Sequence, residues 1–306
     1  MKAVRIHRFG GPEVLQVDDI ALPVAAHGKL LIRVMAASVN PVDYKIRKGG
    51  YPEVAEADLP ITLGRDVAGL VETAGGGFEA GDAVYAHLDW ADGGYAEYAL
   101  CAPAGIAAKP SSLDMIQAAA VPLAATTAWQ GLFDQGQLKA GERVLIHGAS
   151  GGVGAFAVQF ARIAGAEVIA TASAEEADRV VAYGAAQVID HRAQKFEEVV
   201  HDVDLVFDLI GKDTQDRSFQ TLKRGGRLIS TVQEPDPARA EAAGVTAKRY
   251  MATPNAGQLA EIAKLIDSTQ VQVTVAKTFT LGQATEAHRM IEEGHPHGKI
   301  VLEVAQ

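Results

Sequence analysis

This sequence of 306 residues has a single cysteine, no long apolar run and fewer basic residues than acidic ones. Cys101 alone cannot form an internal disulfide or a cysteine-rich zinc site. Because no run of about 18 apolar residues occurs, no segment is expected to span a membrane. The net charge of −10 argues against a nucleic-acid partner, since phosphate binding needs a basic face. The first six residues lack the apolar core of a signal peptide, so we expect a cytoplasmic protein in a reducing setting.

The first hundred or so residues contain short apolar segments that are separated by turn-forming residues. These segments, typical of strands, are 29–35, 66–73, 83–87 and 95–100. Glycines at 75–77 and at Gly81 mark turns between them. Regular strand spacing without a helical period predicts a partly closed β-barrel.

From about Leu113 onward, strand-like segments alternate with helix-like ones. Strands are predicted at 143–147, 167–171, 187–190, 205–208 and 227–231, and helices at 153–164, 174–183 and 213–222. This alternation predicts an α/β domain with a parallel, doubly wound sheet. After about residue 265, a strand (271–279), a helix (283–293) and a final strand (299–304) are predicted, and this tail either extends the parallel sheet or returns to the barrel.

The segment 144–154, with the sequence VLIHGASGGVG, is the most informative part of the chain. A buried strand leads directly into glycines spaced three residues apart, and an apolar helix follows. A dinucleotide site needs this arrangement, because the turn must be tight and the backbone must approach a pyrophosphate closely. Backbone N–H groups at the helix N-terminus then attract the phosphates. The predicted cofactor-binding residues are Gly148, Ser150, Gly151, Gly152, Val153 and Gly154; a glycine-rich turn without a ligand is the alternative.

The end of the next predicted strand, residues 170–173, bears on which dinucleotide is bound. NAD enzymes usually place an acid there to accept from the ribose 2′-hydroxyl, whereas this sequence has Ala-Thr-Ala-Ser. The missing acid favours NADPH, since a carboxylate would repel a 2′-phosphate. Glu175 and Glu176 argue the other way, because they stand where basic residues would help. The candidates for contacting the 2′-phosphate are Ser173, Arg179, His191 and Arg192.

Four motifs occur in a characteristic order: ASVNPVD at 37–43, GRDVAG at 64–69, GYAEY at 94–98 and the glycine-rich turn. Together they resemble the zinc-free quinone oxidoreductase (zeta-crystallin-like) branch of the medium-chain dehydrogenase/reductase superfamily, over essentially the whole chain. The resemblance implies a GroES-like barrel domain that is interrupted in sequence by a Rossmann domain. It also implies an active site in the cleft between them, and a homodimer. The expected domains are 1–115 with 270–306 (GroES-like) and 116–269 (Rossmann).

Zinc-dependent relatives hold a catalytic zinc with a Cys, a His and a second Cys or acid. The positions that match the first two ligands hold Asn40 and Arg65 in this sequence, and no cysteine lies near residues 121–129. Because tetrahedral zinc needs nitrogen and sulfur ligands, we expect no metal. His295 and His297 flank a proline, and two histidines without further ligands are expected to lie in a solvated turn.

Without zinc, the chemistry that the resemblance implies is hydride transfer from NADPH to a quinone or an α,β-unsaturated carbonyl compound. Such acceptors need positioning and hydrogen bonds to their oxygen more than a Lewis acid. The resemblance implies that Asn40 holds substrate or cofactor, that Tyr51 lines the substrate pocket as a hydrogen-bond or proton donor, and that Thr127 approaches the nicotinamide. Leu209 and Ile210 follow a predicted strand, at the sheet edge where cofactors bind.

Asn40 and Tyr51 also have plain structural alternatives, an Asx-turn and loop packing. Two other functions stay open: an enoyl-thioester reductase, and an NADPH-binding protein of low turnover. The acidic chain shows no basic groove for a carrier's phosphopantetheine, which disfavours the first. The cleft motifs are retained, which disfavours the second.

Overall fold

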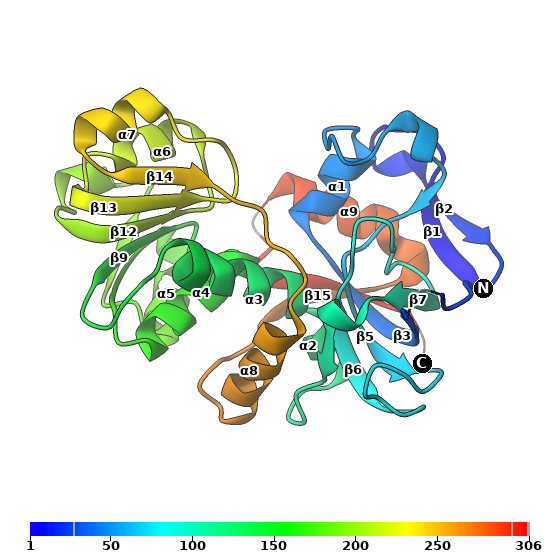
Figure 1. Ribbon diagram of the computed structural model, residues 1–306. Helices are drawn as coiled ribbons and strands as arrows, with labels where there is room; N and C mark the ends of the chain where they lie inside the picture. Colours follow the sequence, from blue (N-terminus) through cyan, green and yellow to red (C-terminus); the bar gives the residue numbers. More distant parts are fainter. Residues whose placement is uncertain (27, 295, 305–306) are drawn as a thin grey trace. The chain divides into compact units, whose positions relative to one another are not determined.

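The structure, a computed structural model, describes residues 1–26, 28–294 and 296–304 (Figure 1). The chain forms two compact units. Unit 1 comprises Met1–Leu123, Pro254–Thr269 and Val273–Gln306, and unit 2 comprises Ala124–Thr253 and Gln270–Gln272. The main segment of unit 2 therefore stops at Thr253, before the limit of 269 that we predict for the Rossmann domain.

Helix α8 (Ala256–Asp267) accounts for that earlier end. It packs against strand β8 (Ile106–Ala108) of unit 1 rather than against the parallel sheet. The Asp267 carboxylate accepts hydrogen bonds from the backbone N–H and the hydroxyl groups of both Ser111 and Ser112, at 2.7–3.0 Å. Helical periodicity locates such a helix but does not say which sheet it covers.

Unit 1 contains a seven-stranded and a three-stranded sheet, joined by a bridge between Ala3 and Ala96. The larger sheet has the order β15 (Val275–Thr280), β16 (Lys299–Glu303), β3 (Leu30–Val39), β5 (Asp66–Val71), β6 (Ala83–His87) and β8, with β7 (Tyr98–Cys101) also on β3. The smaller has the order β2 (Leu15–Asp19), β1 (Lys2–Ile6) and β4 (Ile61–Thr62). Because β15 and β16 join this unit, the carboxyl-terminal tail returns to the barrel domain, as the resemblance implies.

Short helices accompany these sheets. They are α1 (Pro41–Arg47), α2 (Met115–Ala119), α8 and α9 (Ala284–Glu293), with single turns η1 (Pro12–Val14), η2 (Glu56–Asp58), η3 (Pro103–Gly105) and η7 (Leu281–Gln283). Helix α9 packs against α1 and β16. Apolar side chains of both sheets, among them Ile32, Val67 and Ile300, are excluded from solvent and form one core.

Unit 2 is a parallel, doubly wound sheet, which confirms the predicted fold class. Its strand order is β11 (Gln187–Asp190), β10 (Glu167–Ala172), β9 (Arg143–His147), β12 (Val203–Asp208), β13 (Leu222–Ser230) and β14 (Thr246–Arg249), and every pair is parallel. Its helical segments are α3 (Pro122–Trp129), η4 (Gln130–Gln135), α4 (Gly152–Ile163), η5 (Ala174–Glu176), α5 (Ala177–Tyr183), η6 (Phe196–Glu198), α6 (Lys212–Ser218) and α7 (Pro237–Ala243). Helices α4 and α5 cover one face and α6 and α7 the other (Figure 1).

The strand order places the carboxyl ends of neighbouring strands at one edge of the sheet. The order in which the chain adds strands changes direction at β9, because β10 and β11 lie on one side of β9 and β12 to β14 lie on the other. Ligands of open α/β sheets bind at such a switch point. Among the described residues, no helix is long and apolar enough to serve as a membrane span.

Candidate functional site

The glycine-rich turn between β9 and α4 has the geometry that a dinucleotide site requires. Gly148 leaves the strand with a φ of 72°, a left-handed conformation that favours glycine. A Cβ added at Gly154 would lie 2.2 Å from the Gly148 carbonyl oxygen and 2.7 Å from the Ala149 Cα. Only glycine therefore lets the first turn of α4 pack this closely on the turn.

The N-terminus of α4 is open to an anion. Gly151 is the N-cap residue, and no side chain caps the helix there. A Cβ added at Gly151 would meet nothing nearer than the Gly148 carbonyl oxygen, at 3.4 Å. The N–H groups that begin a helix lack partners within it, and the helix dipole adds partial positive charge. Gly152, Val153 and Gly154 thus fit the pyrophosphate of a dinucleotide, which their N–H groups would hold.

The other predicted cofactor residues of unit 2 lie at the same sheet edge. Ser173 directly follows β10, and His191 and Arg192 follow β11. Ile210 follows β12 and is 48% exposed. A Cβ added at Gly148 would lie 3.0 Å from the Ile210 Cδ1, so these two residues are neighbours. The structure thus brings together residues that are separated by up to about 60 positions in sequence.

The loop after β12 is held by a buried acid that sequence inspection does not single out. Asp208 accepts from the backbone N–H of Ile210 at 3.0 Å and of Gly211 at 2.8 Å. Its other oxygen accepts from Gln215 at 3.0 Å and from Ser230 at 2.8 Å. With four donors the carboxylate is well satisfied, and it fixes the loop that contains Leu209 and Ile210.

The candidate 2′-phosphate residues already have acidic partners. Arg179 forms an ion pair with Glu176 on the same stretch of helix. Arg192 lies 3.5 Å from Glu175, and both side chains are more than half exposed. His191 is anchored through its Nδ1 to the Ala172 carbonyl oxygen at 2.9 Å. Glu176 and Glu175 thus partly neutralise Arg179 and Arg192, the two arginines that are candidates for contacting the 2′-phosphate.

In unit 1, Asn40 belongs to a buried polar cluster rather than to a free turn. It ends β3 and precedes α1, which Pro41 begins. Its amide nitrogen donates to Asp66 at 2.8 Å, and its amide oxygen accepts from Lys299. Ser38 also donates to Asp66, at 2.7 Å. A substrate contact by Asn40 would have to use the remaining amide N–H, which lies near Ser38 at 3.4 Å.

Asp66 and Lys299 are both removed from solvent in this cluster. Their charged groups lie 3.8 Å apart. Burial raises the pKa of Asp66, and the Lys299 charge opposes that shift. Burial also lowers the pKa of Lys299, against the attraction of Asp66 and Asp43. Each ion therefore depends on the other to stay charged.

Asp43 begins a chain of buried hydrogen bonds. Its Oδ2 accepts from the Asn40 backbone N–H at 2.7 Å and from the Tyr95 hydroxyl at 2.8 Å. Burial raises the pKa of Asp43 to about 6. The Tyr95 hydroxyl lies 3.4 Å from His288, whose other ring nitrogen lies 3.0 Å from Arg47. Because arginine only donates, this chain cannot pass a proton to solvent through Arg47.

Tyr51, Trp90 and Arg65 form a stacked group beside that cluster. The Arg65 guanidinium lies over the Trp90 ring, 3.8 Å from its centroid. Trp90 in turn packs on Tyr51, with ring centroids 4.9 Å apart. Tyr51 therefore lies on a loop and packs against Trp90, on whose ring Arg65 also lies.

Thr127 lies on α3 and is 8% exposed. Its carbonyl oxygen accepts from the Tyr250 hydroxyl. Among the described residues, no group of three His, Cys, Asp or Glu side chains is arranged to hold a metal ion. His295 lies outside the described residues.

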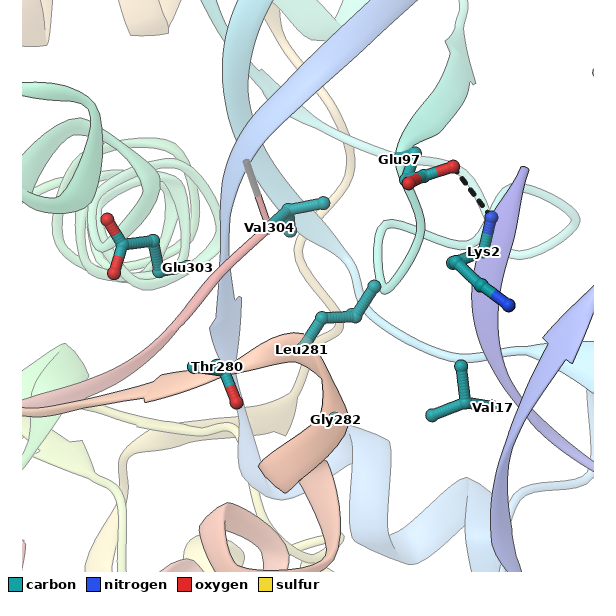
Figure 2. Close-up of a pocket in the computed structure, with 8 residues that line it drawn as sticks. All are labelled: Lys2, Val17, Glu97, Thr280, Leu281, Gly282, Glu303 and Val304. Atoms are coloured by element: carbon teal, nitrogen blue, oxygen red, sulfur yellow. Dashed lines mark hydrogen bonds between the residues drawn. The ribbon is translucent and has the colours of Figure 1, made fainter. Parts of the chain in front are cut away.

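A pocket of about 340 Å³ lies elsewhere in unit 1. Figure 2 shows its lining: Lys2, Val17, Glu97, Thr280, Leu281, Gly282, Glu303 and Val304. The Lys2 backbone N–H donates to Glu97 at 2.7 Å in this view (Figure 2). The lining of this pocket includes none of the predicted site residues.

Three residues of this site escape sequence inspection. Asp66 follows Arg65 in the GRDVAG motif, and its place in that motif is a moderate indication that it belongs to the site. Trp90 lies in a segment without a clear period, and Lys299 enters from the last strand. No local pattern connects Lys299 with Asn40, because the two are 259 positions apart.

Family matches cover both parts of the chain. Residues 26–111 match the family described as alcohol dehydrogenase GroES-like domain, and residues 183–302 match the family described as zinc-binding dehydrogenase. The chain is 40% identical over 240 residues to a quinone oxidoreductase of Pongo abelii, which covers 75% of this chain and 72% of the relative.

Two further similarities extend over the full length. An NADPH-dependent alkenal/one oxidoreductase, chloroplastic, of Arabidopsis thaliana is 32% identical over 317 residues, or 99% of this chain and 79% of the relative. Among solved structures, the quinone oxidoreductase of Escherichia coli complexed with NADPH has a TM-score of 0.89 at 29% identity, and the match covers 99% of this chain and 100% of that one.

Proposed function

Because the chain belongs to the zinc-free, quinone oxidoreductase-like branch of the medium-chain dehydrogenase/reductase superfamily, we propose that it uses NADPH to reduce a quinone or an α,β-unsaturated carbonyl compound. The observation that carries the proposal is the turn from β9 into α4. Its glycines leave the helix N-terminus uncapped and closely packed on the strand end, which suits a pyrophosphate.

When bound, NADPH would supply a hydride to the β-carbon of an enone or to a quinone, and one proton would complete the saturated ketone or the hydroquinone. Either reaction creates negative charge on an oxygen, so nearby donors lower the barrier.

Unit 1 supplies the side chains that we propose to act on the substrate. Tyr51 would donate a hydrogen bond or a proton to the substrate oxygen, from a loop where it packs on Trp90. Asn40 would hold substrate or cofactor with its remaining amide N–H. The hydrogen bonds of Asn40 to Asp66 and Lys299 fix its amide, which favours positioning over free movement.

Unit 2 supplies the residues that we propose to hold the cofactor. The turn residues Gly148 and Ser150 to Gly154 would hold the pyrophosphate, and Leu209, Ile210 and Thr127 would contact the nicotinamide. Ser173, Arg179, His191 and Arg192 would contact the 2′-phosphate. For that contact, Arg192 would exchange its partner Glu175 for the phosphate, which the exposure of this ion pair permits.

NADPH oxidation, followed at a fixed enzyme concentration with a panel of quinones, 2-alkenals, enones and an enoyl-CoA, tests the proposal. Turnover with quinones or enones, and a preference for NADPH over NADH, is the expected result. Turnover with the enoyl-CoA alone would favour the enoyl-thioester reductase. NADPH binding without oxidation by any acceptor would favour a binding protein of low turnover and overturn the proposal.

A homodimer, a cytoplasmic location and the domain limits 1–115, 116–269 and 270–306 are also proposals. Light scattering on a size-exclusion column measures the oligomeric state directly. A mass of twice 32.2 kDa is the expected value for a dimer, and a mass near 32.2 kDa would refute it.

A further inference from the structure

Unit 1 contains two buried arginines whose surroundings differ sharply. Arg47 is fully excluded from solvent and satisfied: it donates to the Gly10 carbonyl oxygen at 3.1 Å, to His288 at 3.0 Å, and to Glu292. Arg65 is 4% exposed, and its Nε donates to the Leu88 carbonyl oxygen at 2.9 Å. Arg47 is thus a structural arginine, whereas the described residues leave part of the Arg65 guanidinium without an acceptor.

The unsatisfied part of Arg65 is a specific atom. Its Nη1 is buried and has no hydrogen-bond partner among the described residues. No carboxylate of those residues lies within 4.0 Å of the guanidinium, so Arg65 forms no ion pair with them. Buried arginines are rare unless they are paired, and a buried donor without an acceptor costs about 1–3 kcal/mol. A native chain keeps such a group where it serves a ligand or a reaction.

Carboxylates near Arg65 favour its charged form, but none of those described lies close enough to form an ion pair with it. Burial lowers the pKa of Arg65, while the more distant carboxylates of Asp43, Asp66 and Asp89 raise it. Arginine starts from so high a pKa that it remains a cation. Asp66 already has Lys299 as its ionic partner. The net result is a buried positive charge with one free donor, beside the aromatic pair of Trp90 and Tyr51.

We propose that Arg65 is a catalytic residue that donates a hydrogen bond from Nη1 to the substrate oxygen on which negative charge develops. The inference rests on the proposed function. As the hydride reaches the substrate carbon, the displaced electron pair moves onto that oxygen, and the guanidinium stabilises it without giving up a proton. The proton that completes the product comes from water or from the Tyr51 phenol. A positive charge held by a side chain thereby takes the place of a Lewis acid.

The aromatic side chains beside Arg65 come from loops. Tyr51 lies between α1 and η2, and Trp90 lies between β6 and β7, so neither belongs to a regular strand or helix. Both side chains are half-buried. For Nη1 to reach a substrate a neighbouring side chain has to move, and we infer that it is the Trp90 ring, over which the guanidinium lies.

Three substitutions of Arg65, to Met, Lys and Ala, test this role. In Arg65→Met the charge is lost, and we expect kcat with an enone to fall about 100- to 1000-fold, the loss typical of one oxyanion donor. In Arg65→Lys the charge is kept without the planar fork, and we expect a smaller loss. NADPH affinity, measured by fluorescence titration, should change less than twofold in both variants. Free guanidinium at millimolar concentration should restore part of the activity of Arg65→Ala.

A pair of acceptors separates catalysis from structural damage. A strongly oxidising quinone needs less charge stabilisation than an enone, so Arg65→Met should lose less activity with the quinone; general misfolding would lower both equally. The matched control is Arg33→Met, which should leave kcat unchanged. Arg33 lies on β3 and is 45% exposed, and its ion pair with Glu72 is weak because the charged groups are 3.8 Å apart.

The outcomes distinguish the two proposals. If the wild-type protein reduces quinones or enones but Arg65→Met keeps its kcat with the enone, the Arg65 role is wrong and the proposed function stands. If Arg65→Met loses activity equally with both acceptors and guanidinium restores none in Arg65→Ala, the role is also wrong. If the wild-type protein reduces no acceptor, both proposals fail.

Discussion

Gly154 gives the most direct test of the dinucleotide site. A Cβ at this residue would meet the Gly148 carbonyl oxygen at 2.2 Å and the Ala149 Cα at 2.7 Å. Both are backbone atoms, so no side chain can rotate away to make room. Gly154 has no positive φ, so the penalty of Gly154→Ala comes from the collision and not from the backbone conformation.

The size of the effect follows from that distance. Moving the Cβ from 2.2 Å to the 3.4 Å at which ordinary contact begins requires about 1.2 Å of separation between α4 and the turn. Overpacking of this kind typically costs about 1–3 kcal/mol in the free energy of unfolding. A displacement of about 1 Å in a binding site can cost on the order of 100-fold in function. We therefore expect Gly154→Ala to weaken NADPH binding at least about tenfold.

Two further glycine substitutions make the test specific. Gly151→Ala meets nothing nearer than 3.4 Å in the protein, so it should leave the unfolding free energy within about 1 kcal/mol and still weaken NADPH binding, because its methyl group enters the space proposed for the pyrophosphate. Gly282→Ala has no atom within 4 Å and should change neither quantity. NADPH fluorescence titration and urea unfolding measure the two effects. Wild-type NADPH affinity in both Gly151→Ala and Gly154→Ala would refute the assignment of the pyrophosphate to α4.

Three more predictions follow from charged residues. Glu175→Gln should strengthen NADPH binding about two- to fivefold and leave NADH unchanged, because it frees Arg192 from a weak ion pair; equal changes for both nucleotides would contradict this. Lys299→Met should lower the unfolding free energy by about 3–5 kcal/mol in urea titration, because it leaves a buried carboxylate unpaired; a loss below about 1 kcal/mol would contradict it. Asp267→Asn should destabilise the protein at pH 7 by no more than about 1 kcal/mol, because Asp267 is exposed and solvent screens its interactions; against a small effect of burial, hydrogen bonds from Ser111 and Ser112 lower the pKa of Asp267 to about 2 in the folded protein. A lowered folded pKa stabilises above the unfolded pKa, so the difference between the two proteins should vanish as the pH falls from about 4 to 2; a pH-independent difference would show that the carboxylate charge is not responsible.

The sequence predicts unit 2 well because its signals are local. Strands β9 and β11 have the predicted bounds, 143–147 and 187–190. Buried parallel strands are short apolar runs, and the intervening helices repeat every 3.6 residues. The glycine turn is also a local signal, because its backbone conformation and close packing need glycine at particular positions. The sheet edge at which we expect the cofactor can therefore be predicted without knowledge of tertiary contacts.

Unit 1 is less predictable, because its site depends on contacts between distant segments. No helix is predicted at residues 41–47, where α1 lies, although Pro41 at its start and Asp43 two residues later are ordinary signals of a helix N-terminus. Lys299 reaches Asn40 from the last strand, and only the order β16, β3, β5 brings it there. Register across a sheet is a property of the whole fold, and no period in the sequence encodes it.

The charges of unit 1 show why an unsatisfied arginine suits this reaction. Two buried carboxylates, Asp43 and Asp66, stand with two buried cations, Arg65 and Lys299. Lys299 is committed to Asp66 and Asn40. Burial raises the pKa of Asp43 to about 6, so this carboxyl is mostly ionised at neutral pH and the charges of the four groups nearly cancel. The Arg65 guanidinium nevertheless keeps a buried donor, Nη1, that has no acceptor among the described residues. Hydride transfer adds one negative charge to the substrate oxygen, and a donor that is already held in place stabilises that charge without reorganisation. The donor that is costly to bury in the resting protein is therefore stabilising when the oxyanion forms.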